Sequence, residues 1–228
     1  MVTVNRVSRV KPERVSALIL AAGSGDRLGS RPKAFLRFNG QTLLERAVNV
    51  VSPFATEIIV GVRSEDMSRA RKLVPKTVHV VAGGATRQET LSCLLRSCTK
   101  PIIVLHEVAR PFVTFDLFER LLQEVRRHGA VALYTEVPAR DSLGFREKQA
   151  LKMILPRRSV VALQIPHAYR REILLRADRL AARNHWHEEG TAAIVKRAGH
   201  KVRLVPGSPD NLKITYAADL RFRPRHQA

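Results

Sequence analysis

The chain alternates short apolar runs with segments in which apolar residues recur at helical spacing. Short hydrophobic runs bounded by Gly, Pro or polar residues are typical of buried strands. The intervening segments carry apolar residues at the spacing of a helix with one buried face. The strands predicted in this way cover residues 17–20, 58–60, 78–81, 102–105, 130–137 and 201–205. Because strands alternate with helices, we expect an α/β fold whose sheet is mostly parallel, with helices on both faces.

Capping residues mark where the helices begin. Thr42 with Glu45, and Thr86 with Glu89, have the spacing of a capping box, in which each side chain bonds the other residue's backbone N–H. The other expected starts are Ser64 and Thr114, with a helix to residue 127 after Thr114, and further helices are expected over residues 170–183 and 190–198.

The alternation breaks over residues 138–158, which lack helical periodicity. A long insertion without regular structure is usually functional, so we predict an extended arm that leaves the domain. A plain surface loop is the alternative. We expect residues 1–228 to form a single domain, with residues 1–14 as a basic N-terminal arm and residues 221–228 as a polar tail.

Composition is typical of a globular protein, with 45% hydrophobic residues. No apolar run approaches the roughly 20 residues that span a bilayer, and the basic start lacks the apolar centre of a signal peptide. Cys93 and Cys98 show no metal-ligand pattern, so we expect buried or free thiols in a reducing compartment. These features predict a cytoplasmic protein that does not contact a membrane.

Charge is the unusual property of this sequence. The sequence has 40 Lys and Arg residues and 20 Asp and Glu residues, which gives a formal net charge of +20. Such an excess attracts any polyanion in a salt-dependent way. The basic residues are nevertheless scattered through every segment, and only 5% of residues are aromatic. The interleaving of Arg and aromatic residues that binds single-stranded nucleic acid is missing, so we predict no specific nucleic-acid partner.

A loop of small residues follows the first predicted strand and consists of Ala21, Ala22, Gly23, Ser24 and Gly25. Small side chains let backbone N–H groups approach an anion closely. Arg27 and Lys33 add positive charge beside the loop, a combination suited to a triphosphate. The loop matches neither the P-loop nor the dinucleotide fingerprint. An ordinary Gly-rich turn with solvated basic residues is the alternative.

Polar residues also follow later strands of the predicted sheet. Gly84 and Arg87 come after the third strand, and Glu107 and Arg110 come after the fourth. Ligands of open α/β sheets bind outside the carboxyl ends of the strands. We therefore expect these residues to share one crevice with the loop that follows the first strand.

Taken in order, these motifs resemble the 2-C-methyl-D-erythritol 4-phosphate cytidylyltransferases of the non-mevalonate isoprenoid pathway, over about residues 17–220. The matching segments are 21–28, 32–33, 83–87, 106–111, 164–166 and 211–215. The resemblance implies a Rossmann-like three-layer nucleotidyltransferase fold with a protruding dimerisation arm. It also implies transfer of CMP from CTP to the polyol phosphate, release of pyrophosphate, Mg²⁺ as cofactor, and a homodimer whose arm completes the neighbour's site.

The resemblance also implies roles for individual residues. Arg27 and Lys33 match the catalytic cations. The nucleotide-binding positions are the loop of residues 21–25 together with Gly84, Ala85, Arg87 and Thr90. The acceptor-binding positions are Lys213, Arg110, Thr191 and, from across the dimer, Arg157. The metal-binding positions are Glu107 and Asp210.

Several positions depart from the family's pattern. The family usually has Asp where this chain has Glu107, which moves the carboxylate by one methylene. The family's Thr-Asp-Asp/Glu-Ala-Ser motif falls on residues 189–193, where its acidic residue and its Ser are missing. The family's Gln-Thr-Pro-Gln motif falls on residues 164–167, which read Gln-Ile-Pro-His. Two alternatives therefore stay open: a cytidylyltransferase for another alditol phosphate such as ribitol 5-phosphate, and a non-catalytic paralogue that binds nucleotide.

Overall fold

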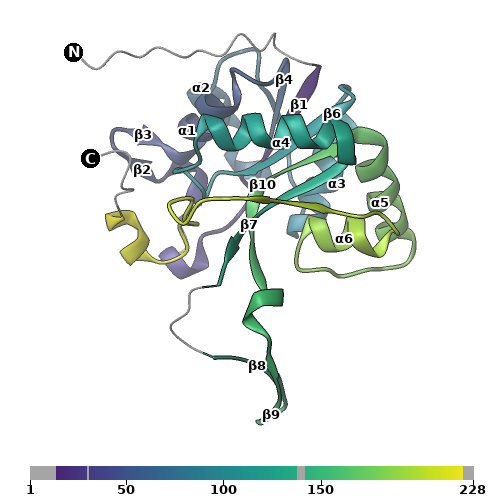
Figure 1. Cartoon of the computed structure of the whole chain (residues 1–228). Helices are drawn as coiled ribbons and strands as arrows, with labels where there is room; N and C mark the ends of the chain where they lie inside the picture. The colour runs from purple at the N-terminus through teal and green to yellow at the C-terminus, as the bar shows by residue number, and fades with distance from the viewer. Residues whose placement is uncertain (1–13, 30, 138–141, 223–228) are drawn as a thin grey trace, which may run out of the picture.

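A central sheet organises the computed structural model, which describes residues 14–29, 31–137 and 142–222 (Figure 1). Seven strands lie in the order β11-β7-β10-β6-β1-β4-β5. Their bounds are β1 Val15–Leu20, β4 Glu57–Val62, β5 His79–Ala82, β6 Ile102–Glu107, β7 Ala130–Glu136, β10 Val161–Arg170 and β11 Arg203–Pro206. Neighbouring strands run parallel except around β10, which is antiparallel to both β6 and β7. The expected mostly parallel sheet is confirmed.

Strand β10 is the one strand of this sheet that the hydrophobic pattern does not predict. Its apolar run is interrupted by Pro166, which has no N–H to donate to a neighbouring strand. The strand accommodates the proline at a bulge, where its register against β7 shifts between Gln164 and His167. A proline inside a central strand thus hides the strand from sequence reasoning.

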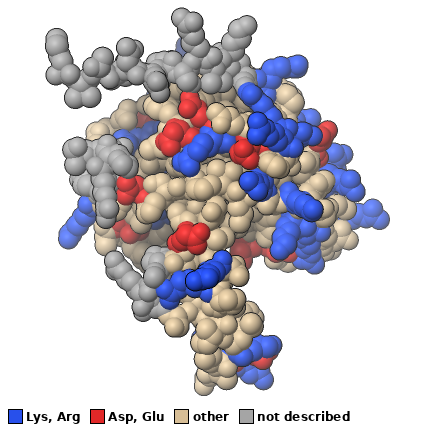
Figure 2. Space-filling view, in the orientation of Figure 1, with Lys and Arg blue, Asp and Glu red and all other residues tan. Residues whose placement is uncertain are grey.

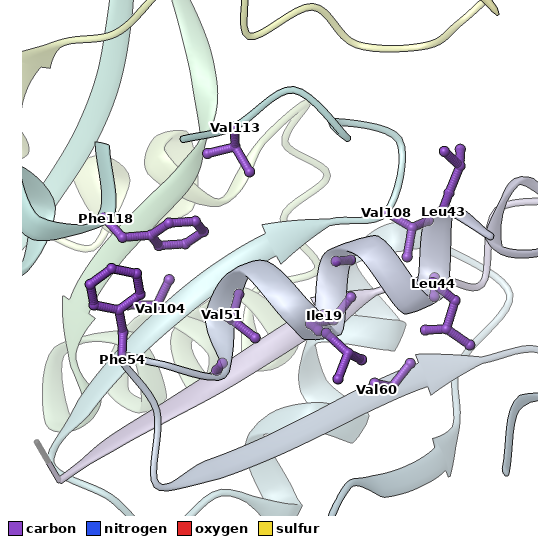
Figure 3. Close-up of a cluster of buried hydrophobic side chains, with 14 of the residues drawn as sticks. Ile19, Leu43, Leu44, Val51, Phe54, Val60, Val104, Val108, Val113 and Phe118 are labelled. Carbon is purple, nitrogen blue, oxygen red and sulfur yellow. The ribbon is translucent and has the colours of Figure 1, made fainter. Parts of the chain in front are cut away.

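Helices cover both faces of the sheet and produce the expected three layers. Their bounds are α1 Leu43–Val51, α2 Met67–Leu73, α3 Arg87–Ser97, α4 Phe115–His128, α5 Arg171–Arg183 and α6 Thr191–Arg197. Along β1, Ala17 and Ile19 pack into a core with α1, α2 and α4, part of which Figure 3 shows. Leu18 and Leu20 point the other way, into a core with α3, α5 and α6. None of the described helices combines the length and apolar character needed to cross a membrane.

The capping residues act as predicted at two of the four helix starts. Both capping boxes form, at α1 and at α3, and each cap of this kind stabilises a helix by about 1 kcal/mol. The prediction for Ser64 is wrong, because a 3₁₀ turn over Ser64–Asp66 precedes α2 and no side chain caps that helix. Thr114 does occupy the N-cap position of α4, but its hydroxyl donates to the Asp116 carboxylate instead of accepting from the backbone.

The predicted arm is a two-stranded antiparallel hairpin that projects from the main body (Figure 1). It consists of β8 (Leu143–Glu147) and β9 (Ala150–Leu155), inserted between β7 and β10, which pair with each other at its base. Residues 138–141 of the arm lie outside the described residues, as do residues 1–13 of the N-terminal arm and residues 223–228 of the tail. A second short hairpin joins β2 (Arg37–Phe38) to β3 (Gln41–Thr42).

Candidate active site

A cavity of about 540 Å³ opens where the parallel strands β1, β4, β5 and β6 end. Its walls come from the segments that follow these strands, together with Lys33, Thr90 and Lys213. This volume falls within the usual range of small-molecule sites, and the place is the one that the strand-end rule predicts. The sheet thus gathers segments that are far apart in the sequence around one hollow.

Small residues shape this hollow because backbone segments meet there. Gly25 has a φ of +77°, and a Cβ on it would lie 1.9 Å from the carbonyl oxygen of Arg31. A Cβ on Gly84 would lie 2.2 Å from the Cβ of Glu89. A larger residue at Gly25 would distort the loop after β1, and a larger residue at Gly84 would displace the first turn of α3. The glycines are therefore needed for the shape of the cavity.

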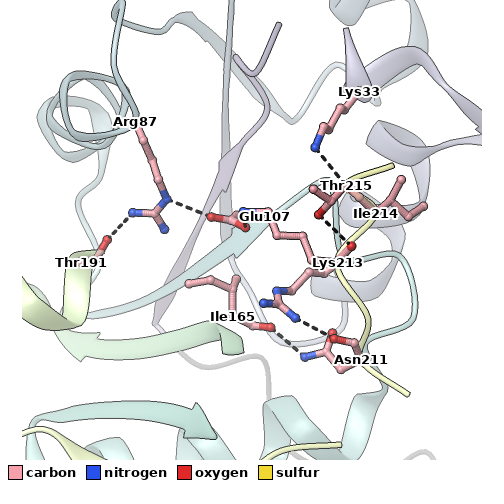
Figure 4. Close-up of polar contacts among 10 residues, drawn as sticks. Lys33, Arg87, Glu107, Ile165, Thr191, Asn211, Lys213, Ile214 and Thr215 are labelled. Atoms are coloured by element: carbon pink, nitrogen blue, oxygen red, sulfur yellow. Dashed lines mark hydrogen bonds and ion pairs between the residues drawn. The ribbon is translucent and has the colours of Figure 1, made fainter. Parts of the chain in front are cut away.

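Three cations, Lys33, Lys213 and Arg27, lie close enough to repel one another near the C-terminal segment. The Lys33 ammonium donates to the carbonyl of Ile214 at 2.9 Å (Figure 4), and the Ile214 N–H donates to the carbonyl of Ala109 at 2.7 Å. Partial burial, followed by repulsion from Lys213 and Arg27, lowers the pKa of Lys33. Because these cations repel one another, a polyanion in the cavity would stabilise all three.

The carboxylate of Glu107 lies between Arg87 and Lys213 (Figure 4). Its Oε1 accepts from Nε of Arg87 at 2.9 Å, and its Oε2 lies 3.1 Å from Nζ of Lys213. Burial alone would raise the pKa of Glu107, but Arg87 and Lys213 outweigh it and lower that pKa to about 2. The Arg87 Nη1 donates to Oγ1 of the fully buried Thr191 at 2.9 Å, so Arg87 links α3 to α6.

The loop after β5 is held by side chains from α3. The Thr90 hydroxyl donates to the carbonyl of Thr86 at 2.9 Å and accepts from the N–H of Gly84 at 3.2 Å. The Glu89 carboxylate accepts from the N–H of Ala85 at 2.8 Å. Gly84, Ala85 and Thr90 thus line the cavity as part of one rigid turn.

Other residues singled out in the sequence are not part of the cavity lining formed by the described residues: Ala21, Gly25, Arg27, Arg110, Arg157, Thr191 and Asp210. Arg27 stacks over the ring of Tyr216 at 5.5 Å. Arg110 donates to the carbonyl of Asn211 at 2.7 Å and so fastens the C-terminal segment. Arg157 lies in a 3₁₀ turn, Arg157–Ser159, between the arm and β10. The expected single crevice therefore includes Lys33, Gly84, Arg87 and Glu107, with Arg27 and Arg110 beside it.

Comparison with known proteins places this geometry in a family. The family model described as 2-C-methyl-D-erythritol 4-phosphate cytidylyltransferase matches residues 15–223. The chain belongs to that family. The Deinococcus radiodurans protein of this name is 36% identical over 208 residues, 91% of this chain and 87% of the relative. The Thermus thermophilus protein of the same name is 36% identical over 90% of this chain and 93% of its own length.

Solved structures of cytidylyltransferases share the fold. The crystal structure of the Thermus thermophilus cytidylyltransferase superposes with a TM-score of 0.77 at 34% identity, covering 90% of this chain and 95% of that chain. The 4-diphosphocytidyl-2C-methyl-D-erythritol synthase of Anaerococcus prevotii reaches a TM-score of 0.79 at 22% identity and covers 92% and 95% of the two chains. The second likeness shows the fold alone, and both agree with the three layers seen here.

Sequence reasoning missed one wall of this cytidylyltransferase cavity. Arg63, Ser64 and Glu65 follow β4 and line the hollow. Arg63 is held by ion pairs to Asp66 at 2.7 Å and to Glu65 at 3.3 Å. The strand-end rule applies here too, but Ser64 followed by Glu65 and Asp66 also has the pattern of a helix start, which conceals the wall. Applying that rule to every parallel strand would have found this wall.

Only part of the predicted metal site fits a divalent cation. No group of three or more His, Cys, Asp and Glu residues capable of holding a metal occurs among residues 14–29, 31–137 and 142–222. Magnesium that arrives with nucleotide phosphates needs only one or two protein carboxylates, and Glu107 in the cavity wall can serve as one. Asp210 lies away from the cavity lining, so the structure does not bring the two predicted ligands together there.

Stability in acid tests the environment of Glu107. The pKa of Glu107 in the folded protein is about 2, below the usual 4.5. Its contribution to the free energy of unfolding is therefore complete above about pH 4.5 and is lost as the pH falls toward 2. The contribution is on the order of 3 kcal/mol. Urea unfolding at pH 7 and at pH 3 should show a smaller loss of stability in Glu107→Gln than in the unmodified protein.

The matched control for this measurement is Glu147→Gln. Glu147 is exposed on the arm and pairs with Lys152 at 2.9 Å. Its replacement should therefore leave the loss of stability between pH 7 and pH 3 unchanged. Equal acid losses in Glu107→Gln and in the unmodified protein would contradict the assignment of this pKa.

Proposed function

We propose that the chain transfers CMP from CTP to 2-C-methyl-D-erythritol 4-phosphate and releases pyrophosphate, a step of isoprenoid biosynthesis. The observation that carries the proposal is the cavity at the strand ends, which combines glycine-shaped loops with Lys33, Lys213 and Glu107. Relatives named for this activity match the chain along nearly its whole length, which supports the choice of acceptor. Residues 189–193 depart from a motif that the resemblance assigns to the acceptor, which makes the acceptor the point to test.

The reaction is an in-line substitution at the α-phosphorus of CTP. An oxygen of the acceptor phosphate forms the new P–O bond, the bond from the α-phosphorus to the bridging oxygen breaks, and its electron pair leaves with pyrophosphate. Little covalent chemistry falls to the protein, which positions the groups and stabilises charge. Lys33, fixed by the carbonyl of Ile214, and Arg27 beside it supply the positive charge for the transferring and leaving phosphates.

The two substrates are assigned to different walls of the site. Cytidine is assigned, from the resemblance, to the turn at Gly84 and Ala85 and to Thr90, which line the cavity together. The triphosphate is assigned to the loop of residues 21–25. The acceptor phosphate is assigned to Lys213, with Thr191 and Arg110 behind it and the partner's Arg157 completing the site.

Magnesium belongs to this proposal as a cofactor that enters with CTP. Bound there, it would neutralise part of the triphosphate's charge and polarise the phosphates. Glu107 would hold it on the protein side, since it is the carboxylate at the end of β6 in the cavity wall. We place the enzyme in the cytoplasm, because Cys93 and Cys98 are both free thiols, as in proteins of a reducing compartment.

The arm supports a homodimer as the active form. A two-stranded hairpin is marginally stable by itself, so a projecting one needs a partner surface. On this hairpin Phe145, Leu151 and Ile154 are 50%, 65% and 59% exposed. Exposed apolar side chains gathered in one place are typical of a surface that binds another protein. We assign this surface to a second copy of the chain, whose cavity then receives Arg157 from the base of the arm.

Pyrophosphate release tests the function directly. Purified protein with CTP and Mg²⁺ should release pyrophosphate with 2-C-methyl-D-erythritol 4-phosphate and far more slowly with ribitol 5-phosphate. Faster release with ribitol 5-phosphate would transfer the activity to another acceptor. No release with any polyol phosphate, in protein that binds CTP, would identify a non-catalytic paralogue.

Single substitutions test the catalytic cations. Lys33→Ala and Arg27→Ala should each lower kcat by about 10²-fold or more and change the KM for the acceptor far less, because their charge acts in the transition state. Lys76→Ala removes an exposed lysine outside the cavity lining and should behave like the unmodified enzyme. A residue whose alanine variant keeps nearly full kcat is not catalytic.

Mixed dimers test whether the arm completes the neighbouring site. Lys33→Ala and Arg157→Ala chains, each inactive alone, should recover roughly a quarter of full activity after exchange, since half of the dimers are mixed and one of their two sites is intact. If Arg157 acted within its own chain, every site in a mixed dimer would carry one defect. Activity that stays at the sum of the two single variants, after demonstrated exchange, would refute the shared site.

A further inference from the structure

Arg87 follows the turn that the resemblance assigns to the nucleotide, but the hydrogen-bond partners of its guanidinium lie on other elements. Although it begins α3 shortly after the turn at Gly84 and Ala85, its guanidinium bonds Glu107 at the end of β6 and Thr191 at the start of α6 (Figure 4). Nε donates to Glu107 at 2.9 Å, and Nη1 donates to Thr191 at 2.9 Å. Two nitrogens of the planar Arg87 guanidinium thus donate hydrogen bonds to other protein groups, which fixes its orientation.

Glu107 depends on its two cations in different ways. Its side chain is only 9% exposed, whereas those of Arg87 and Lys213 are 33% and 42% exposed. Lys213 lines the cavity and is the cation assigned to the acceptor phosphate, so binding of the acceptor draws its ammonium away from Glu107. Before magnesium enters with CTP, Arg87 is then the remaining cation from the described residues that pairs with this carboxylate, which is costly to leave buried and unpaired.

We propose that Arg87 is a positioning residue for the acceptor: it retains Glu107 while Lys213 exchanges that carboxylate for the acceptor phosphate. Thr191 holds the guanidinium of Arg87 in the orientation that this exchange requires. The inference rests on the proposed function and moves Arg87 from the nucleotide to the polyol phosphate. It also gives Thr191, whose hydroxyl is fully buried, a role through Arg87 instead of through direct contact with the acceptor.

Separate binding measurements for the two substrates test this assignment. Arg87→Met nearly keeps the length of the side chain and removes its donors, so that Lys213 is the one cation among the described residues still bonded to Glu107. Calorimetry should show 2-C-methyl-D-erythritol 4-phosphate binding about tenfold or more weakly, because its phosphate must now break a solitary buried ion pair. The affinity for the non-reactive analogue α,β-methylene-CTP should change less than about threefold.

A double-mutant cycle separates action through Arg87 from direct contact by Thr191. Thr191→Val should weaken acceptor binding when Arg87 is present and have little further effect in Arg87→Met, because both changes remove the same link. Thr191→Ser keeps the hydroxyl and should restore acceptor affinity. The control is Thr99→Val, which removes an exposed hydroxyl bonded to Glu57 at 2.9 Å at the start of β4, the opposite end from the cavity.

Each outcome decides the proposal. A larger loss for α,β-methylene-CTP than for the acceptor would make Arg87 a nucleotide ligand and overturn it, as would additive effects of Arg87→Met and Thr191→Val. If circular dichroism shows that Arg87→Met is unfolded, Arg87→Lys should show the same acceptor-selective loss, because one ammonium does not reproduce the planar fork. Unmodified protein that binds CTP but no acceptor refutes the proposed function, whereas full turnover with additive losses refutes this inference alone.

Discussion

The nearly buried carboxylate of Glu107 is the constraint on which the site depends. A charge in that place must be compensated, and the compensation comes from Arg87 on α3 and Lys213 on the C-terminal segment. One ionised group therefore ties the end of β6 to two parts of the chain more than a hundred residues apart. The ion pair with Glu107 also holds the Lys213 ammonium at the cavity wall before any phosphate arrives.

Most of the fold could be predicted from the sequence because local and long-range signals agree. The apolar runs in β1, β4 and β6 are buried on both faces, and the capping boxes at Thr42 and Thr86 begin helices where the pattern places them. The predictions are wrong where one residue type is common in two different kinds of local structure. Pro166 conceals β10 because prolines usually interrupt strands, and Ser64 resembles a cap although it begins a 3₁₀ turn.

The candidate site was predictable as a location but not as a set of contacts. Strand ends identify the loops around Gly84 and Glu107, since topology alone brings them together. The direction of a long side chain is decided by partners that lie far away in the sequence. Arg110 fastens Asn211 and Arg87 bonds Thr191, and no spacing in the sequence records either choice.

The arm leaves the sheet from the end of β7 and returns at the start of β10, two strands that pair with each other through Val161 and Glu136. Exit and return therefore lie side by side, and the hairpin is in effect an enlarged connection between neighbouring strands. Such a connection can lengthen, shorten or change its surface during evolution while the sheet keeps its register. The surface of the hairpin can thus diverge among descendants of this protein while the strand ends that line the cavity stay in place.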